Sequence, residues 1–248
     1  MTDAPRLGSG SLLNFMSPIS DERADAIVRA LAAESPATIA DYGCGWGELL
    51  LRLLAAAPEA TGIGVDVHGA DIARARANAE RRGLDHRATF VEGPATDVDG
   101  TADIIVSIGA YHAFGGIPEA LAALRDRLNP GGRLLFGVEF WDRVPDADRL
   151  SKMWPGMSVD DCMELGDIAD LAVAAGFRPL SIQVSGADEW DVFESGINAD
   201  VERWLLANPR HPEADELRAK LDHQRDRWLR GTRGYFGFAF FTLGAPGS

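Results

Sequence analysis

Cysteine, basic residues and long apolar runs are all scarce in this 248-residue sequence. The two cysteines, Cys44 and Cys162, are too few for a disulfide framework, and no spacing of His, Cys or Asp indicates a metal site. No apolar run approaches the roughly 18 residues of a transmembrane helix, and the N-terminus has no signal-peptide pattern. We therefore expect two reduced thiols, no metal, no membrane association and a cytoplasmic location.

Acidic side chains outnumber basic ones by 38 to 24, which gives a formal net charge of −14. A nucleic-acid backbone would be repelled by this charge. The densest basic stretch, residues 218–233, is interleaved with acids, as is typical of a solvated helix face. The sequence therefore predicts a small-molecule substrate and no nucleic-acid partner, and it leaves a monomer and a homodimer equally open.

From residue 37 onward, short β-branched runs alternate with amphipathic stretches. This alternation indicates a doubly wound α/β fold, in which helices cover both faces of a mostly parallel sheet. The seven expected strands are 37–42, 61–67, 89–92, 102–108, 133–140, 179–184 and 235–243. The expected helices are 20–33, 48–57, 70–82, 117–128, 167–175, 191–207 and 212–230. The stretch 141–161 has no steady period, so we expect a loop or lid there.

Three glycines lie at alternate positions after the first expected strand, in the segment Asp41-Tyr42-Gly43-Cys44-Gly45-Trp46-Gly47. Glycines let the backbone turn tightly and approach a ligand, and the following helix N-terminus offers free N–H groups. Asp66 ends the second expected strand, where a carboxylate can accept hydrogen bonds from ribose hydroxyls. This combination predicts a nucleoside-binding site, with a glycine turn that binds nothing as the simpler alternative.

An NAD-dependent oxidoreductase is a competing hypothesis for such a glycine turn. The dinucleotide fingerprint is G-x-G-x-x-G, whereas the glycines here run G-x-G-x-G and Glu48 stands where the third glycine would be. Asp41 would repel a pyrophosphate but suits a cationic methionine group. The motif therefore favours a different nucleoside ligand.

The order of the segments 41–47, 66, 103–108 and 128–133 resembles the class I S-adenosylmethionine-dependent methyltransferases. The chain is similar to their ubiquinone/menaquinone C-methyltransferase branch. Within it, the chain resembles a bacterial small-molecule subgroup, marked by Glu139, Trp141 and the segment 188–191. The resemblance implies a Rossmann-like fold with helical and loop lid insertions. It implies one domain over 1–248, with an N-terminal cap (1–36), a cofactor-binding half (37–140), and a lid with substrate-side elements and the last strands (141–248).

The resemblance also implies that S-adenosylmethionine is the methyl donor and S-adenosylhomocysteine the product. Asp66 would hold the ribose, and Val67 would pack on the adenine. Many relatives have an Asp at the position of Pro94 that accepts from the adenine amino group, for which Asp97 is a possible substitute. The expected cofactor contacts are Asp41, Gly43, Cys44, Gly45, Gly47, Asp66, Val67, Pro94, Ala95, Ser107, Ile108 and Gly109.

A sulfonium methyl group is already activated, so the enzyme mainly aligns a nucleophile, excludes water and removes a proton. His112 and Glu139 follow or end expected strands and are the candidate catalytic groups, although each can instead have a local structural role. The expected acceptor contacts are Phe15, Met16, Tyr111, His112, Phe114, Glu139, Trp141, Trp154, Trp190 and Asp191. These acids and aromatics suit an amine or aromatic metabolite methylated on N, O or C. A non-catalytic donor-binding sensor or partner subunit is the alternative from another class.

Overall fold

The computed structural model describes residues 3–247, which divide into two compact units. The larger unit consists of Ser20–Glu139, Leu165–Val184 and the chain from Phe238 onward. The smaller unit consists of the chain up to Ile19, Phe140–Glu164 and Ser185–Gly237. Each unit therefore combines segments that are far apart in the sequence.

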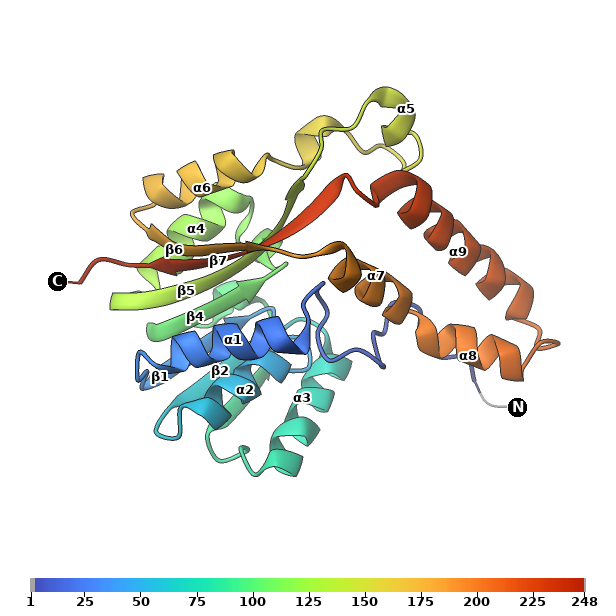
Figure 1. The fold of residues 1–248 in the computed structure, drawn as a ribbon. Helices are drawn as coiled ribbons and strands as arrows, with labels where there is room; N and C mark the ends of the chain where they lie inside the picture. The colour runs from blue at the N-terminus through green and yellow to red at the C-terminus, as the bar shows by residue number, and fades with distance from the viewer. Residues whose placement is uncertain (1–2, 248) are drawn as a thin grey trace. The chain divides into compact units, whose positions relative to one another are not determined.

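The larger unit is built on a seven-stranded sheet with the order β3-β2-β1-β4-β5-β7-β6 (Figure 1). The pairs from β3 across to β5 are parallel, and β6 and β7 pair antiparallel. The strands are β1 (Thr38–Tyr42), β2 (Thr61–Asp66), β3 (Ala88–Glu92), β4 (Ala102–Ile108), β5 (Leu128–Trp141), β6 (Arg178–Val184) and β7 (Phe236–Gly244). The predicted mostly parallel, seven-stranded sheet is confirmed. Its strand order reverses between β1 and β4, which is where ligands bind in such sheets.

Helices cover both faces of this sheet (Figure 1). One layer contains α1 (Asp21–Ala32), α2 (Glu48–Ala56) and α3 (Gly69–Arg82), and the other contains α4 (Ile117–Asp126) and α6 (Leu165–Ala174). The side chains of α2 that are completely buried are Leu50, Leu51, Leu53 and Leu54. Each contributes about 1.5–3 kcal/mol by leaving water. The helix that follows the glycine turn is therefore firmly seated on the sheet.

Local signals set the helix ends in this unit. The Ser20 side chain accepts a hydrogen bond from the Arg23 N–H at 3.3 Å, as expected of an N-cap. Helix α3 ends at Gly83, whose φ of 65° is left-handed. At the start of α4, Glu119 accepts from the Gly116 N–H at 3.0 Å. These caps define the turns that connect the strands to the helices.

The smaller unit is mainly helical. Its helices are α5 (Ala147–Leu150), α7 (Ala187–Gly196), α8 (Ala199–Ala207) and α9 (Ala214–Asp226), and α9 continues into the π-helical turn η4 (Arg227–Thr232). Helices α8 and α9 share a core with the N-terminal segment, made by Val201, Trp204, Leu205, Ala214, Leu217 and Leu221 against Ala4 and Leu7. None of the described helices is long and apolar enough to cross a membrane.

The single helix predicted over 191–207 is wrong, because the chain breaks between α7 and α8. Asn198 lies in the break, where its side chain accepts from the Gly8 N–H at 2.6 Å and donates to Gln224 at 2.7 Å. These partners are distant in sequence, so periodicity within the segment does not reveal them. The break is stabilised by tertiary hydrogen bonds that a continuous helix would lose.

The segment expected to be a loop or lid, 141–161, is an ordered connection with one short helix, α5, and a 3₁₀ turn over Val159–Asp161. Arg149 donates to the carbonyls of Gly231 at 2.6 Å and Arg233 at 2.8 Å. Carbonyl groups at the end of a helix need such partners. The segment is thereby attached to the end of η4.

Candidate active site

The glycine turn between β1 and α2 has left-handed backbone at all three glycines, with φ of 79° at Gly43, 51° at Gly45 and 71° at Gly47. A Cβ added at Gly43 would lie 2.3 Å from the Cβ of Ala110, and one at Gly47 would lie 2.5 Å from Cε1 of Phe90. At Gly45 a Cβ would meet nothing within 4 Å. Gly43 and Gly47 therefore permit close packing, whereas Gly45 borders open space.

Asp66, at the end of β2, faces this turn. Its Oδ2 accepts from the Gly45 N–H at 2.9 Å, and its Oδ1 accepts from the His68 N–H at 2.9 Å. Nδ1 of His68 also lies 3.1 Å from Oδ1. Each carboxylate oxygen has about two acceptor sites, so Oδ2 can still accept a ribose hydroxyl. His68 lies two positions after Asp66 and orients its carboxylate, and it was not among the site residues expected from the sequence.

Asp41 is 4% exposed at the carboxyl end of β1. Within the described part of the chain, no hydrogen-bond donor reaches its carboxylate. Burial, and secondly the charge of Asp66, raise the pKa of Asp41 to about 8. Burial, and then the charges of Asp41 and Asp66, raise the pKa of the Cys44 thiol. The site therefore contains one buried carboxyl group, near that of Asp66, whose ionised form a bound cation would stabilise.

The residues expected beside the adenine lie at the ends of β2 and β3. Val67, directly after β2, is 61% exposed. Pro94 precedes the short 3₁₀ turn η1 (Ala95–Asp97), in which the Asp97 N–H donates to the Pro94 carbonyl at 3.1 Å. Ala95 is buried. Val67 thus presents an open apolar surface at this edge of the sheet.

At the carboxyl end of β4, Gly109 has a φ of 65° and, like Gly45, borders open space. The preceding Ser107 is completely buried, and its hydroxyl has no hydrogen-bond partner within residues 3–247. Ser107 is one position beyond Val106, which pairs with Asp41. Side chains alternate along a strand, so those of Ser107 and Asp41 point to opposite faces of the sheet.

Three expected acceptor residues of the larger unit come together. Tyr111, in the 3₁₀ turn η2 (Tyr111–Phe114), donates from its hydroxyl to Oε1 of Glu139 at 2.6 Å. The Nε2 atom of His112 lies 3.6 Å from the same oxygen, and the rings of Tyr111 and His112 stack with centroids 3.8 Å apart. His112 is exposed, and Tyr111 is buried. Phe114 instead packs edge-on against Tyr42, with ring centroids 5.8 Å apart.

The other expected acceptor residues belong to the smaller unit. Trp141 is buried, and its indole N–H donates to the Val159 carbonyl at 2.8 Å. Trp154 is 43% exposed, and its ring lies 5.7 Å from that of Phe236. Asp191 forms an ion pair with Arg233, Phe15 and Trp190 are half-buried, and Met16 is exposed. Of this set, Trp154 and Met16 have the most surface available for a ligand.

The residues that the structure describes contain no group of three or more His, Cys, Asp or Glu side chains that could hold a metal ion. The polar groups gathered at the switch between β1 and β4 are instead two carboxylates and open glycine backbone. Carboxylates beside open glycine backbone suit a ligand with hydroxyl and cationic groups.

Residues 39–132 match the family model described as a methyltransferase domain. The uncharacterized protein YjhP of Escherichia coli is 28% identical over 245 residues, which cover 97% of this chain and 98% of YjhP. The crystal structure of YjhP matches with a TM-score of 0.85. A SAM-dependent methyltransferase from Thiobacillus denitrificans, solved in complex with S-adenosyl-L-homocysteine, is 28% identical with a TM-score of 0.85, covering 98% of this chain and all of that one.

A ubiquinone/menaquinone biosynthesis C-methyltransferase from Dinoroseobacter shibae is 31% identical over 114 residues. These cover 45% of this chain and 46% of that relative, so the chain spans about half the length of this relative. The family match contains the glycine turn, Asp66 and the residues at the end of β4. The sheet order and these matches together identify the chain as a member of the class I S-adenosylmethionine-dependent methyltransferases.

Proposed function

We propose that this enzyme transfers the methyl group of S-adenosylmethionine to a small molecule, an amine or an aromatic metabolite, at the carboxyl ends of β4 and β5. The observation that carries the proposal is the fixed relation between Asp66 and Gly45: a 2.9 Å hydrogen bond points the carboxylate at the one glycine of the turn that borders open space.

The residues of the larger unit fit the donor. Asp66 would accept from the ribose hydroxyls, Gly45 and Gly109 leave room for backbone contact, and Val67 offers an apolar surface to the adenine. Asp41, buried without a hydrogen-bond partner in the described chain, would be stabilised by the positive charge of the methionine portion. The bound donor supplies a methyl group on a sulfonium, which needs no further activation.

Glu139 and His112 are the groups that would orient the acceptor and remove its proton. Oε1 of Glu139 is occupied by the Tyr111 hydroxyl, whereas Oε2 has no partner within the described residues. Oε2 would accept a hydrogen bond from an N–H or O–H of the acceptor and orient its lone pair. His112 is exposed, lies 3.6 Å from Oε1 and would take the proton that the acceptor loses on a ring nitrogen.

A small acceptor is supported by the charge of the chain. The net charge of −14 opposes a nucleic-acid substrate, and it attracts cationic molecules such as amines. The curated C-methyltransferase relative also acts in the biosynthesis of quinones, which are small molecules. These observations favour a metabolite as the acceptor.

The test is turnover with labelled S-adenosylmethionine against a panel of amines, phenols and activated carbon acids. We expect S-adenosylhomocysteine to form with one class of acceptor, and a Glu139→Gln variant to lose that activity while it still binds S-adenosylhomocysteine. Donor binding without turnover across all three classes would contradict the proposal and would favour a donor-binding sensor instead.

A further inference from the structure

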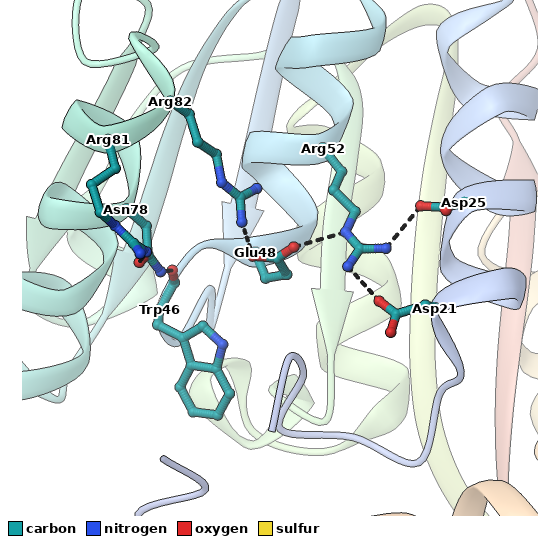
Figure 2. A network of polar contacts seen from close by, with 8 residues as sticks. All are labelled: Asp21, Asp25, Trp46, Glu48, Arg52, Asn78, Arg81 and Arg82. Carbon is teal, nitrogen blue, oxygen red and sulfur yellow. Dashed lines mark hydrogen bonds and ion pairs between the residues drawn. The ribbon is translucent and has the colours of Figure 1, made fainter. Parts of the chain in front are cut away.

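Trp46 stands between two glycines of the cofactor turn, yet its side chain is only 3% exposed. Two side chains of α3 contact it, and a third orients one of these two. Asn78 donates from Nδ2 to the Trp46 carbonyl at 3.1 Å, and Arg81 donates to Oδ1 of the same Asn78 (Figure 2). The guanidinium of Arg74 lies 4.0 Å from the centre of the indole ring. The middle of the turn is therefore attached to α3 through both its backbone and its side chain.

The next residue, Glu48, is attached in the same way. Its carboxylate accepts from Arg52 at 2.8 Å and from Arg82 of α3, and Arg52 also pairs with Asp21 and Asp25 of α1 (Figure 2). The Glu48 side chain is only 10% exposed, so its own ion pairs are partly shielded from water, and removing one partner costs more than in a surface pair. The first turn of α2 is thus joined to α1 and to α3.

Asn78 binds the backbone of the turn at the Trp46 carbonyl, between Gly45 and Gly47. The Gly45 N–H is bound by Asp66, the Gly47 N–H is bound by the Cys44 carbonyl at 2.9 Å, and the peptide between them carries the Trp46 carbonyl. Asn78 is 6% exposed, and its amide is oriented by Arg81. Without this contact, the peptide after Trp46 would gain freedom that the bound ligand would have to remove.

We propose that Asn78 is a positioning residue for the methyl donor: its hydrogen bond to the Trp46 carbonyl holds the glycine turn in the form that receives the ribose and methionine. Arg81 fixes the orientation of the Asn78 amide, and Arg74 fixes the indole ring. The inference rests on donor binding by this turn and is independent of the acceptor.

The experiment measures the Kd of S-adenosylhomocysteine by calorimetry for the wild type and for Asn78→Ala. If one to two backbone residues of the turn become disordered in the free Asn78→Ala variant, the ligand has to order them when it binds. We therefore expect the affinity to fall by about tenfold or more, while kcat at saturating donor stays unchanged. Asn78→Asp is the second variant, because it keeps the side-chain volume and the partner of Arg81 but lacks the N–H donor. It should weaken binding to a similar extent.

Asn129→Ala is the matched control. Asn129 also donates from Nδ2 at 2.8 Å, but to Asp103, which holds the Ala37 and Thr38 N–H groups at the amino end of β1. We expect this variant to lower the Tm and to leave the Kd unchanged. A wild-type Kd in both Asn78 variants, or an equal weakening in Asn129→Ala, would overturn the inference. If the wild type itself binds no S-adenosylhomocysteine, the proposed function fails instead.

Discussion

The hydroxyl of Tyr111 donates a 2.6 Å hydrogen bond to Oε1 of Glu139, and so joins the turn after β4 to the end of β5. The contact leaves Oε2 of Glu139 without a partner in the described chain, while His112 lies beside the occupied oxygen. A hydrogen bond to an ionised group is stronger than one between neutral groups. The carboxylate is therefore held in one orientation, with a single oxygen available to an acceptor.

Replacing Glu139 tests this arrangement most simply. We expect Glu139→Gln to lower kcat by about 10–10²-fold, because the neutral amide oxygen accepts a weaker hydrogen bond from the acceptor than the carboxylate does. Tyr111→Phe should lower it by about tenfold, because a hydrogen bond to a charged group is lost. Neither change should alter the Kd of S-adenosylhomocysteine. Steady-state kinetics at saturating donor gives these values, and Tyr235→Phe, in the other unit, is the control. Full activity in Glu139→Gln would remove Glu139 from the mechanism.

The pKa of Asp41, raised to about 8 by burial and by Asp66, makes donor binding depend on pH. The ionised carboxylate attracts the ammonium group of the ligand's amino-acid portion more strongly than the protonated one does, so affinity should rise with pH up to about 8. The change is at most about tenfold per pH unit below that value. Calorimetry with S-adenosylhomocysteine at pH 6, 7 and 8 measures it. In Asp41→Asn we expect weaker binding and a flat profile, and a flat profile in the wild type would show that Asp41 is not involved.

Asp41 should also destabilise the free enzyme as the pH rises. Its folded-state pKa of about 8 lies above the ordinary value of 3.8, so between these values the folded state holds a proton that the unfolded chain has lost. The free energy of unfolding therefore falls as the pH increases across that window. Asp41→Asn removes the titration, so its Tm should exceed that of the wild type at pH 8 and should equal it near pH 4. A lower Tm for the variant at pH 8 would contradict this.

Gly45 and Gly47 should respond differently to substitution by alanine. Both have positive φ, so each alanine costs about 1–2 kcal/mol of backbone strain. Gly47→Ala also forces a Cβ against Phe90, which costs about 1–3 kcal/mol more, so it should have the lower Tm. Gly45→Ala meets only open space and should instead lose affinity for S-adenosylhomocysteine. Thermal unfolding and calorimetry separate the two effects; unimpaired binding by Gly45→Ala would show that the open space is not the ligand site.

Trp154 offers a test of the acceptor side. Its ring is 43% exposed and contacts Phe236, and the guanidinium of Arg227 lies 5.3 Å from the ring centre. If this ring stacks on an aromatic acceptor, Trp154→Ala should raise the acceptor KM by about tenfold, and Trp154→Phe should raise it less. The donor Kd and the Tm should change little, because the side chain is half exposed. An unchanged KM with an active acceptor would exclude Trp154 from the site.

The glycine turn is the part of the site that can best be predicted from the sequence, because its backbone geometry depends on neighbouring residues. Gly43, Gly45 and Gly47 have the left-handed backbone that glycine spacing predicts, and Asp66 ends the strand that periodicity indicates. The tertiary contacts of these residues are harder to predict from the sequence. The His68 N–H on Asp66 and the Asn78 amide on Trp46 depend on how β2 and α3 pack, and no repeat pattern encodes them.

The acceptor side shows the same limit. Tyr111 and Glu139 are 28 positions apart, and they meet because β4 and β5 pair with Ile108 opposite Gly137. A strand register of this kind is set by packing across the sheet, so the contact between the two residues was not predicted from the sequence. The break between α7 and α8 is similar, since Asn198 finds its partners at Gly8 and Gln224. Contacts between distant segments are what a single sequence reveals least.

The most direct test of the account is a calorimetric titration of the wild-type protein with S-adenosylhomocysteine and, separately, with NAD. The carboxylate of Asp66 beside open Gly45 predicts one site per chain for S-adenosylhomocysteine, with a Kd within the range of about 1 μM to 1 mM that enzymes show for their substrates, and no heat with NAD. Binding of NAD at one site per chain, or no binding of S-adenosylhomocysteine, would contradict it.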